Sequence, residues 1–543
     1  MSPQDVFFGI CPLPWARTHG TGSAVGRGHI PPHAYPPPHF EDRVRKFALP
    51  CTLVCALVSS VAAVACTKAP VTDAVGVAPI TEADEGPMMT VDAMIARAKT
   101  RDYWPVGAQD WRAHSQAEQD SLMESEACRD FKSYLFPAAD ADAKTAAALG
   151  TTVDKLTGEQ QALRSEGALV VKGGEIVWEH YTGPYAGHPE KRHCMWSASK
   201  SFTTGMMGAL VQSSELTKAG IKAPAGKLTK DGKTLGLATT LNELMDASAL
   251  NEDPRLGKMT IEDLLTMNIP APIWNEGYDG NITTSSVVQM LWVDGSKDMA
   301  KFAGNNLFGP VGPPGGFKYS SGTAVVLMRA LKELYGADYD KMPFASLFDR
   351  LGMKSTVFER DQNGVFVGSS YAHMNLRDMA RFGYAYLNGG FFGGEQVIHP
   401  SFIDKARVVG LGMRAEGTTD EAIVEEGSFY SLGFWINPSP KALEREGVRK
   451  FGANFPFEPA DAEKKIAGNK LKPGQKFFPN VGTDFFFAAG HYGQNIMVFP
   501  KDDLMIVRFS HDNEYFSKID QMMVKARACN LSRPVSPSYG KGG

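Results

Sequence analysis

The chain has 543 residues, of which 43% are hydrophobic, 10% aromatic and 21% charged. This composition is typical of globular domains and excludes a disordered, fibrous or polytopic membrane protein. The 56 Lys and Arg residues are balanced by 60 Asp and Glu residues. Because phosphate contacts need an excess of positive charge, we expect no nucleic-acid partner.

The first part of the chain is expected to be a leader that is not part of the fold. Residues 1–43 are rich in Gly, Pro and His and predict a disordered leader or a stretch before the true start of translation. Residues 44–66 have the basic, apolar and small-residue regions of a secretory signal peptide. Cys66 is a candidate lipidation site, although Ala63 stands where a lipobox usually has Leu. We therefore expect export to the periplasm, or attachment to the outer membrane or cell envelope through lipidated Cys66.

Four of the seven cysteines would remain after cleavage: Cys66, Cys128, Cys194 and Cys529. A disulfide between Cys128 and Cys529 would tie the two ends of the mature chain and is permitted in an oxidising compartment. Three buried thiols are an equally weighted alternative. The sequence alone leaves both interpretations open.

The predicted elements suggest one α+β unit whose antiparallel sheet is built from both chain ends, flanked by helices and joined to a mostly helical subdomain. Two β-rich runs, 168–172 and 175–181, flank Gly173-Gly174 and predict a hairpin. Helical patterns run from about Ser197 to about residue 390, strands return at 495–499 and 504–509, and a final helix has Phe516, Ile519, Met523 and Ala526 on one face. The other expected segments are a tether over 67–91, a polar helical extension over 92–163, a main domain over 164–532 with a surface insertion at about 440–480, and a tail over 533–543.

Ser197 and Lys200 form the first candidate catalytic pair. At helical spacing i, i+3 the Lys amine can reach the Ser hydroxyl, which is a weak nucleophile until a base removes its proton. The plainer interpretation is a capped helix start with a solvated lysine. A second Ser-x-x-Lys, Ser538 to Lys541, shows that such pairs also occur by chance.

Two later polar elements strengthen the catalytic interpretation. Tyr319 lies in a Gly-rich stretch over 314–322, and His491 lies in Ala489-Gly-His-Tyr-Gly-Gln494, directly before a predicted strand. Alone, each residue would be an ordinary packed tyrosine or a structural histidine. Three such elements in this order, each next to a predicted helix or strand, are harder to attribute to chance.

Residues 165–530 resemble the serine β-lactamase-like family of penicillin-recognising hydrolases, in its class C β-lactamase, DD-peptidase and esterase branch. Ser197-Ala-Ser-Lys200 resembles the first motif of that family, Tyr319-Ser-Ser321 the second, and His491-Tyr-Gly493 the third. The stretches at 260–267 and 376–390 resemble landmarks between these motifs. Within the family, the motifs are most similar to those of the 6-aminohexanoate-dimer hydrolase group.

The resemblance implies a role for each of these residues. It assigns Ser197 as the nucleophile, Lys200 as its base, Tyr319 as the proton shuttle, His491 as the residue that orients Tyr319 or the substrate, Ser321 as support within the second motif, and the backbone N–H groups of Ser197 and Gln494 as the oxyanion hole. It implies no metal and no cofactor. The expected partner is a small amide, ester or peptide-like substrate, and the oligomeric state is left open.

Two departures from the family pattern affect the expected substrate. His491 replaces the lysine that grips the carboxylate of a β-lactam, and Ser321 replaces an asparagine. Both favour an esterase or linear-amide hydrolase. The alternatives are a peptidoglycan DD-peptidase or β-lactamase-type penicillin-binding protein, and a non-catalytic binding or sensor module of the same fold.

Overall fold

The structure is a computed structural model, and it describes residues 87–106, 110–156, 160–278, 283–418, 428–439, 442–443, 448, 477–478, 480–512 and 516–531. The predicted leader, the signal with Cys66, most of the tether, nearly all of the insertion at 440–480 and the tail lie outside these residues. In the described part of the chain, no helix is long and apolar enough to cross a lipid bilayer.

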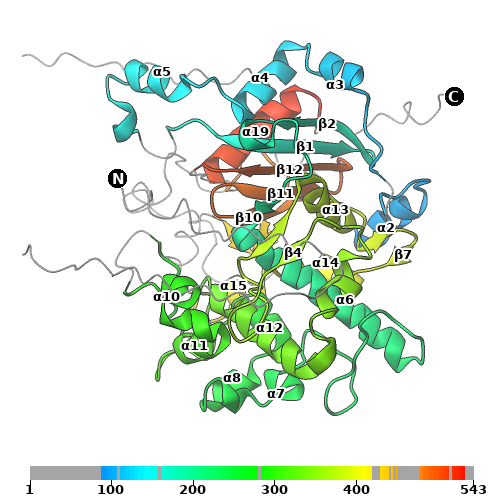
Figure 1. The fold of residues 1–543 in the computed structure, drawn as a ribbon, viewed down its shortest axis with the longest axis vertical. Helices are drawn as coiled ribbons and strands as arrows, with labels where there is room; N and C mark the ends of the chain where they lie inside the picture. The colour runs from blue at the N-terminus through cyan, green and yellow to red at the C-terminus, as the bar shows by residue number, and fades with distance from the viewer. Residues whose placement is uncertain are drawn as a thin grey trace, which may run out of the picture. The chain divides into compact units, whose positions relative to one another are not determined.

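A seven-stranded antiparallel sheet is the centre of the fold (Figure 1), with the order β2-β1-β12-β11-β10-β9-β8. Its strands are β1 (Ser165–Lys172), β2 (Glu175–Tyr181), β8 (Phe429–Tyr430), β9 (Trp435–Ile436), β10 (Phe486–Gly490), β11 (Gln494–Phe499) and β12 (Leu504–Ser510). The predicted hairpin across Gly173-Gly174 is present as β1 and β2. Strand β1 pairs with β12, with Val170 opposite Ile506. The prediction of a sheet built from both chain ends is therefore confirmed.

Helices cover both faces of this sheet. Helix α13 (Leu376–Leu387) packs against β1, β11 and β12, and its Arg377 pairs with Glu179 of β2. The preceding residue of β2, Trp178, faces the opposite side, where Phe131 of α4 contacts it at a ring-centroid distance of 5.9 Å. At Gly383 of α13 a Cβ would lie 2.3 Å from Met505 Sδ, so only glycine permits this approach.

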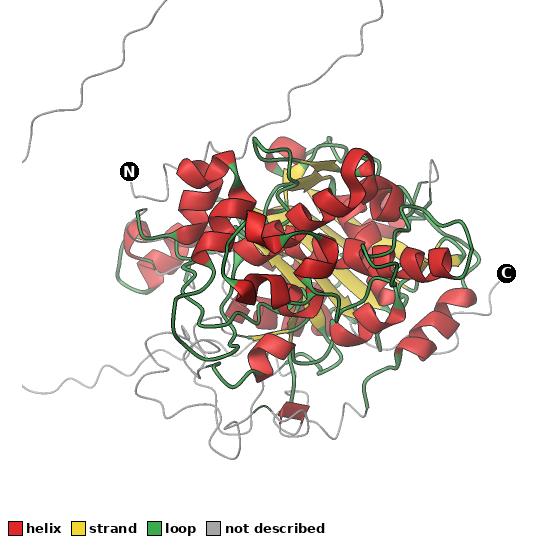
Figure 2. Cartoon of the chain, turned by 90° about the horizontal axis from the view of Figure 1, so that it is seen from below, coloured by secondary structure: helices red, strands yellow, loops and turns green. Residues whose placement is uncertain are grey.

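The helical part of the fold is built around α6 (Ser199–Lys218), which is buried along most of its length and contacts α12 and α14. Figure 2 shows the strands lying among these helices. The other α-helices described in this part of the chain are α7 (Leu241–Leu244), α8 (Pro254–Lys258), α9 (Ile261–Leu265), α10 (Ser286–Trp292), α11 (Met299–Asn306), α12 (Ser321–Tyr335), α14 (Pro400–Lys405) and α15 (Leu411–Arg414). Two small sheets join β3 (His193–Cys194), β5 (Ala372–Met374) and β4 (Val357–Phe358), and β6 (Phe391–Phe392) with β7 (Glu395–Gln396).

Within the described residues, four α-helices precede the sheet: α2 (Val91–Lys99), α3 (Gln116–Leu122), α4 (Glu126–Leu135) and α5 (Ala141–Ala148). They are tied to the sheet by polar contacts from the segments between them. The Arg101 guanidinium lies 2.6 Å from a carboxylate oxygen of Asp503, beside β12. The backbone N–H of His114 donates to the Ile176 carbonyl of β2 at 2.8 Å. The extension thus adds backbone pairing to the edge strand, which its helical sequence pattern did not predict.

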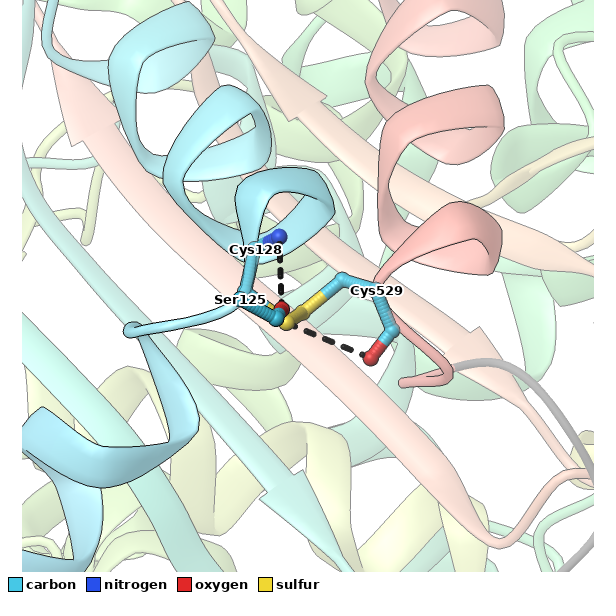
Figure 3. The surroundings of a disulfide bond; sticks show 3 residues. All are labelled: Ser125, Cys128 and Cys529. Carbon is cyan, nitrogen blue, oxygen red and sulfur yellow. Dashed lines mark hydrogen bonds between the residues drawn. A yellow bond between two sulfur atoms is a disulfide. The ribbon is translucent and has the colours of Figure 1, made fainter. Parts of the chain in front are cut away.

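A disulfide joins Cys128 of α4 to Cys529 (Figure 3), which directly follows α19 (Phe516–Ala528). The two cysteines are separated by 401 residues in the sequence, and their Cα atoms lie 4.5 Å apart. Helices α4 and α19 also pack against each other. The sequence left open a disulfide or buried free thiols, and the structure shows the disulfide.

We expect loss of this disulfide to lower stability. Because the bond closes a loop of 401 residues, it restricts the unfolded chain, and a Cys128→Ser/Cys529→Ser variant is expected to lose about 2–5 kcal/mol of unfolding free energy. Urea unfolding of both proteins measures the difference. Reductant should destabilise the parent and leave the double variant unchanged. If the Cys128 and Cys529 thiols of the parent titrate as free in the absence of reductant, the disulfide is not formed.

Candidate active site

Ser197 lies in a short 3-10 turn, Trp196–Ala198 (η4), and not in the helix itself, which begins at Ser199. Trp196 has a φ of 47°, a left-handed conformation that is strained for a bulky residue and is often found at functional sites. The turn packs against β10 and β11. At Gly490 a Cβ would lie 2.2 Å from the Met195 carbonyl oxygen, so glycine allows the sheet to approach the turn.

Lys200 is the polar centre of the site, and only 3% of it is exposed. Its Nζ lies 3.0 Å from Ser197 Oγ and 3.0 Å from Ser321 Oγ. It also donates to the Ser369 carbonyl oxygen at 3.4 Å. A buried amine requires such partners, and here they place it between two hydroxyl groups. The predicted Ser197–Lys200 contact is therefore present, although the serine lies one turn before the helix.

Glu276 is a site residue that the sequence did not predict. One carboxylate oxygen accepts from Ser321 Oγ and lies 3.8 Å from Lys200 Nζ. The other accepts from the backbone N–H of Ser321 at 2.9 Å and from Trp274 Nε1 at 2.6 Å. Because Ser321 is the first residue of α12, the carboxylate also caps that helix. The only sequence signal is that Glu276 is the single charged residue within 268–278.

Tyr319 and Ser321, from the predicted second motif, both reach Lys200. The Lys200 Nζ lies over the Tyr319 ring, 4.8 Å from its centroid. That ring stacks on Trp435 of β9 at 5.4 Å and meets Tyr430 of β8 edge-on at 5.7 Å. Strands β8 and β9, at one edge of the sheet, therefore hold Tyr319 in place beside the lysine.

His491 lies on the aromatic side of the site. Its ring stacks on Tyr278 at 5.1 Å and meets Trp196 edge-on at 5.8 Å. Burial lowers the pKa of His491 to about 4, so the ring is neutral at neutral pH. These contacts connect His491 to the nucleophile turn through Trp196, and the expectation that His491 orients Tyr319 stays a prediction.

Gln494 is the first residue of β11, and its side chain is used within the sheet. The amide group donates to the His491 and Ser510 carbonyl oxygens, each at 2.9 Å, and its oxygen accepts from the Ser510 N–H at 3.1 Å. The side chain is therefore already engaged, and the predicted oxyanion role of the backbone N–H of Gln494 stays a prediction. Packing of η4 against β11 brings this strand beside Ser197.

More aromatic rings surround the nucleophile turn. The Trp196 ring lies 6.2 Å from Trp292, 6.4 Å from Tyr371 and 6.1 Å from Tyr492, as measured between ring centroids. The site therefore combines a hydroxyl, a buried amine and a carboxylate with an aromatic wall. Such an arrangement can perform acyl transfer: the amine takes the proton of the attacking hydroxyl, and the wall accommodates an apolar group.

Comparison with known proteins places most of the chain in one family. The model of the family described as β-lactamase matches residues 149–523. The chain is 24% identical over 322 residues to the 6-aminohexanoate-dimer hydrolase of Paenarthrobacter ureafaciens, covering 58% of this chain and 74% of that protein. Among solved structures it is similar to a 6-aminohexanoate-dimer hydrolase candidate from Bacillus anthracis, at 19% identity, with 69% of this chain and 81% of that chain covered and a TM-score of 0.45. It is also similar to a class C β-lactamase from Rhodobacter sphaeroides, at 14% identity, with 72% and 100% covered and a TM-score of 0.40.

The lowered pKa of His491 predicts a pH dependence of stability. The ordinary pKa of 6.5 applies to His491 in the unfolded chain, and the lowered pKa of about 4 applies in the folded protein. Between these two pH values, the unfolded chain binds a proton at His491 that the folded protein does not. This contribution to stability is complete above pH 6.5 and is lost as the pH falls, by at most about 3 kcal/mol. In urea unfolding at pH 7 and pH 4.5, a His491→Gln variant should lose less stability on acidification than the parent.

The stacking lost in this variant lowers stability equally at both pH values, so only the difference between the two pH values counts. Equal acid sensitivity of the parent and the variant would show that His491 is protonated normally.

Proposed function

Since the chain belongs to the β-lactamase family of serine hydrolases, we propose that it hydrolyses an ester or a linear amide through an acyl-enzyme on Ser197. One observation carries this proposal: the buried Lys200 amine lies 3.0 Å from Ser197 Oγ. A serine hydroxyl beside an amine that is shielded from water is what activation by a lysine base requires.

The proposed reaction has two halves. In the first, Ser197 Oγ attacks the carbonyl carbon, its proton passes to Lys200, and the leaving group departs with a proton delivered through Tyr319. In the second, water gives a proton to the same groups and attacks the acyl carbon, which releases the acid and restores Ser197. The negatively charged oxygen of each tetrahedral intermediate accepts from the backbone N–H groups of Ser197 and Gln494.

The electrostatics of the site favour a simple ester or linear amide over a β-lactam. His491, which stands where related hydrolases have a lysine, is neutral at neutral pH because burial lowers its pKa to about 4. It therefore offers no positive charge to a substrate carboxylate. The hydroxyl of Ser321 is already engaged with Glu276. The relative from Paenarthrobacter ureafaciens, by its name, acts on a linear amide dimer, which agrees with this substrate class.

We also propose that the protein works outside the cytoplasm. The Cys128–Cys529 disulfide supports this, because such bonds persist in oxidising compartments. The signal predicted at 44–66 and the candidate lipidation site at Cys66 point the same way. Titration of thiols in protein isolated from its natural host tests this proposal.

A Ser197→Ala variant tests the nucleophile. We expect kcat for a p-nitrophenyl acyl ester to fall at least about 1,000-fold, because the attacking oxygen is removed. Release of nitrophenolate measures this loss. Ser538→Ala is the matched control, since Ser538 begins the second Ser-x-x-Lys of the chain and is expected to be without effect. If the Ser197→Ala variant is as active as the parent, Ser197 is not the nucleophile and the proposed active site is wrong.

The substrate class is tested with the same two proteins on a panel: the linear 6-aminohexanoate dimer, a D-Ala-D-Ala peptide and a β-lactam. We expect turnover of the ester and the linear amide, with the β-lactam the poorest. If the D-Ala-D-Ala peptide is turned over faster than the ester and the linear amide, the protein is a DD-peptidase. If none of these compounds is turned over, the binding-module alternative replaces the proposal.

A Glu276→Gln variant tests the role of the carboxylate beside Lys200. The carboxylate accepts three hydrogen bonds. A neutral amide weakens all of them and turns one acceptor oxygen into a donor, so kcat should fall about 10- to 100-fold. Loss of the negative charge 3.8 Å from Nζ also makes the protonated amine less favourable. The acid limb of the pH–rate profile should therefore move to lower pH.

Glu243 provides the matched control. Its carboxylate also accepts from one backbone N–H and one hydroxyl group, both of Thr240 at the start of α7, and it pairs with Lys233 at 2.8 Å. Glu243→Gln should leave the pH–rate profile unchanged. If Glu276→Gln lowered stability alone and left both kcat and the profile as in the parent, the carboxylate would be only a helix cap.

A further inference from the structure

Glu166, His193 and His511 form a second cluster of polar side chains, separate from the catalytic groups. They come from β1, β3 and the residue after β12. One nitrogen from each histidine and one carboxylate oxygen all lie within 4.8 Å of one another. Two imidazoles and a carboxylate are a donor set that divalent first-row transition metals prefer.

The orientation of His193 is the observation that points to a ligand. Only 3% of this residue is exposed, and its Nδ1 lies 2.9 Å from the Cys194 carbonyl oxygen. A carbonyl oxygen accepts hydrogen bonds only, so the proton is on Nδ1 and Nε2 carries a lone pair. Within the described residues, this buried Nε2 makes no hydrogen bond. Its nearest charged neighbour is Glu166 Oε2, at 3.4 Å.

Charge makes the cluster suited to a cation. Glu166 brings a carboxylate oxygen, and the contact of His193 Nδ1 with the Cys194 carbonyl leaves the lone pair on Nε2. The carboxylate oxygen and this Nε2 face each other at 3.4 Å. A positive ion between the two would convert a repulsive contact into two bonds.

We propose that Glu166, His193 and His511 bind a divalent transition metal ion of the Zn²⁺ type. Ligands about 2.0–2.1 Å from a tetrahedral ion lie about 3.4 Å from each other, as His193 Nε2 and Glu166 Oε2 do. His511 Nδ1, now 2.7 Å from Glu166 Oε2, would exchange that hydrogen bond for a metal bond. The Nδ1 proton would be released to water as the metal binds.

The Cys194 carbonyl fits this proposal, because metal-binding histidines usually donate their other ring N–H to such a group. The ring of His193 is further fixed by stacking on Phe509 at 4.8 Å and on Tyr185 at 5.7 Å. The side chain of His511 is 43% exposed, so solvent can complete the coordination. The sequence shows no metal-binding spacing because the three ligands are on strands far apart in the chain.

The position of the site suggests a bracing role and no part in the chemistry. Strand β3 leads through Met195 directly into the turn that carries Ser197. After His511, the backbone N–H of Asp512 donates to the Tyr492 carbonyl at 3.2 Å. A metal ion here would hold β1, β3 and the end of β12 together behind the nucleophile turn. The three ligands are therefore positioning residues.

The test measures Zn²⁺ binding to the full chain, free of any histidine tag and stripped with a chelator. Isothermal titration calorimetry gives the number and affinity of sites, and the absorption of bound Co²⁺ reports nitrogen and oxygen ligands. We expect His511→Gln and Glu166→Gln each to weaken one site at least about tenfold. Zn²⁺ should raise the Tm of the parent by more than that of either variant.

His188→Gln is the matched control, since His188 also lies 3.2 Å from a carboxylate, that of Glu190, without a third ligand. It should bind Zn²⁺ like the parent. Histidines of the leader contribute equally to every protein and cancel in the comparison. Ca²⁺ should not compete, because it prefers oxygen ligands.

The proposal is wrong if Zn²⁺ binds with the same stoichiometry and affinity to the parent, His511→Gln and Glu166→Gln. The cluster would then be a hydrogen-bonded group without a metal ion. The far-ultraviolet circular dichroism of each variant must match that of the parent. The His511 variant is the safer one in this respect, because its side chain is partly exposed. The outcome is independent of the proposed hydrolysis, since binding is measured without substrate.

Discussion

A buried lysine amine is the constraint on which the catalytic half of the molecule depends. Placing such a group in the interior costs several kcal/mol unless polar partners replace water. Lys200 finds them in the turn before its own helix, at the start of α12, in the Ser369 carbonyl and in the loop that carries Glu276. These four segments are far apart in the chain. All four segments must therefore come together before the lysine can be buried with its polar partners.

The two sides of Ser197 differ in chemistry. Lys200, Ser321 and Glu276 form a hydrogen-bonded network on one side. Trp196 and the neutral His491 begin an aromatic wall on the other. In the proposed reaction, protons would be exchanged on the polar side, and the acyl group of the substrate would contact the aromatic side. This division agrees with substrates that carry little charge near the scissile bond.

Local sequence patterns predicted the parts of this arrangement that depend on short spacing. Gly173-Gly174 between β-rich runs gave the hairpin, and the three-residue interval from Ser197 gave the contact with Lys200. Strand β10 was not predicted, because an aromatic run that ends in Ala-Ala-Gly has no alternation to distinguish it from a loop. Glu276 was not predicted either. Its role depends on Ser321, 45 residues away, and no local pattern carries that information.

The pairing of β1 with β12 has a consequence for how the chain is made. Residues 165–172 leave the ribosome long before residues 504–510, which are their neighbours in the sheet. During that interval the inner edge of the β1–β2 hairpin has no partner, and unpaired edges of apolar strands invite aggregation. The nascent chain must therefore be kept from pairing with other chains until its last strands emerge. A sheet assembled from consecutive strands has a shorter interval of exposure, so this topology relies more on a holding chaperone or on delayed folding.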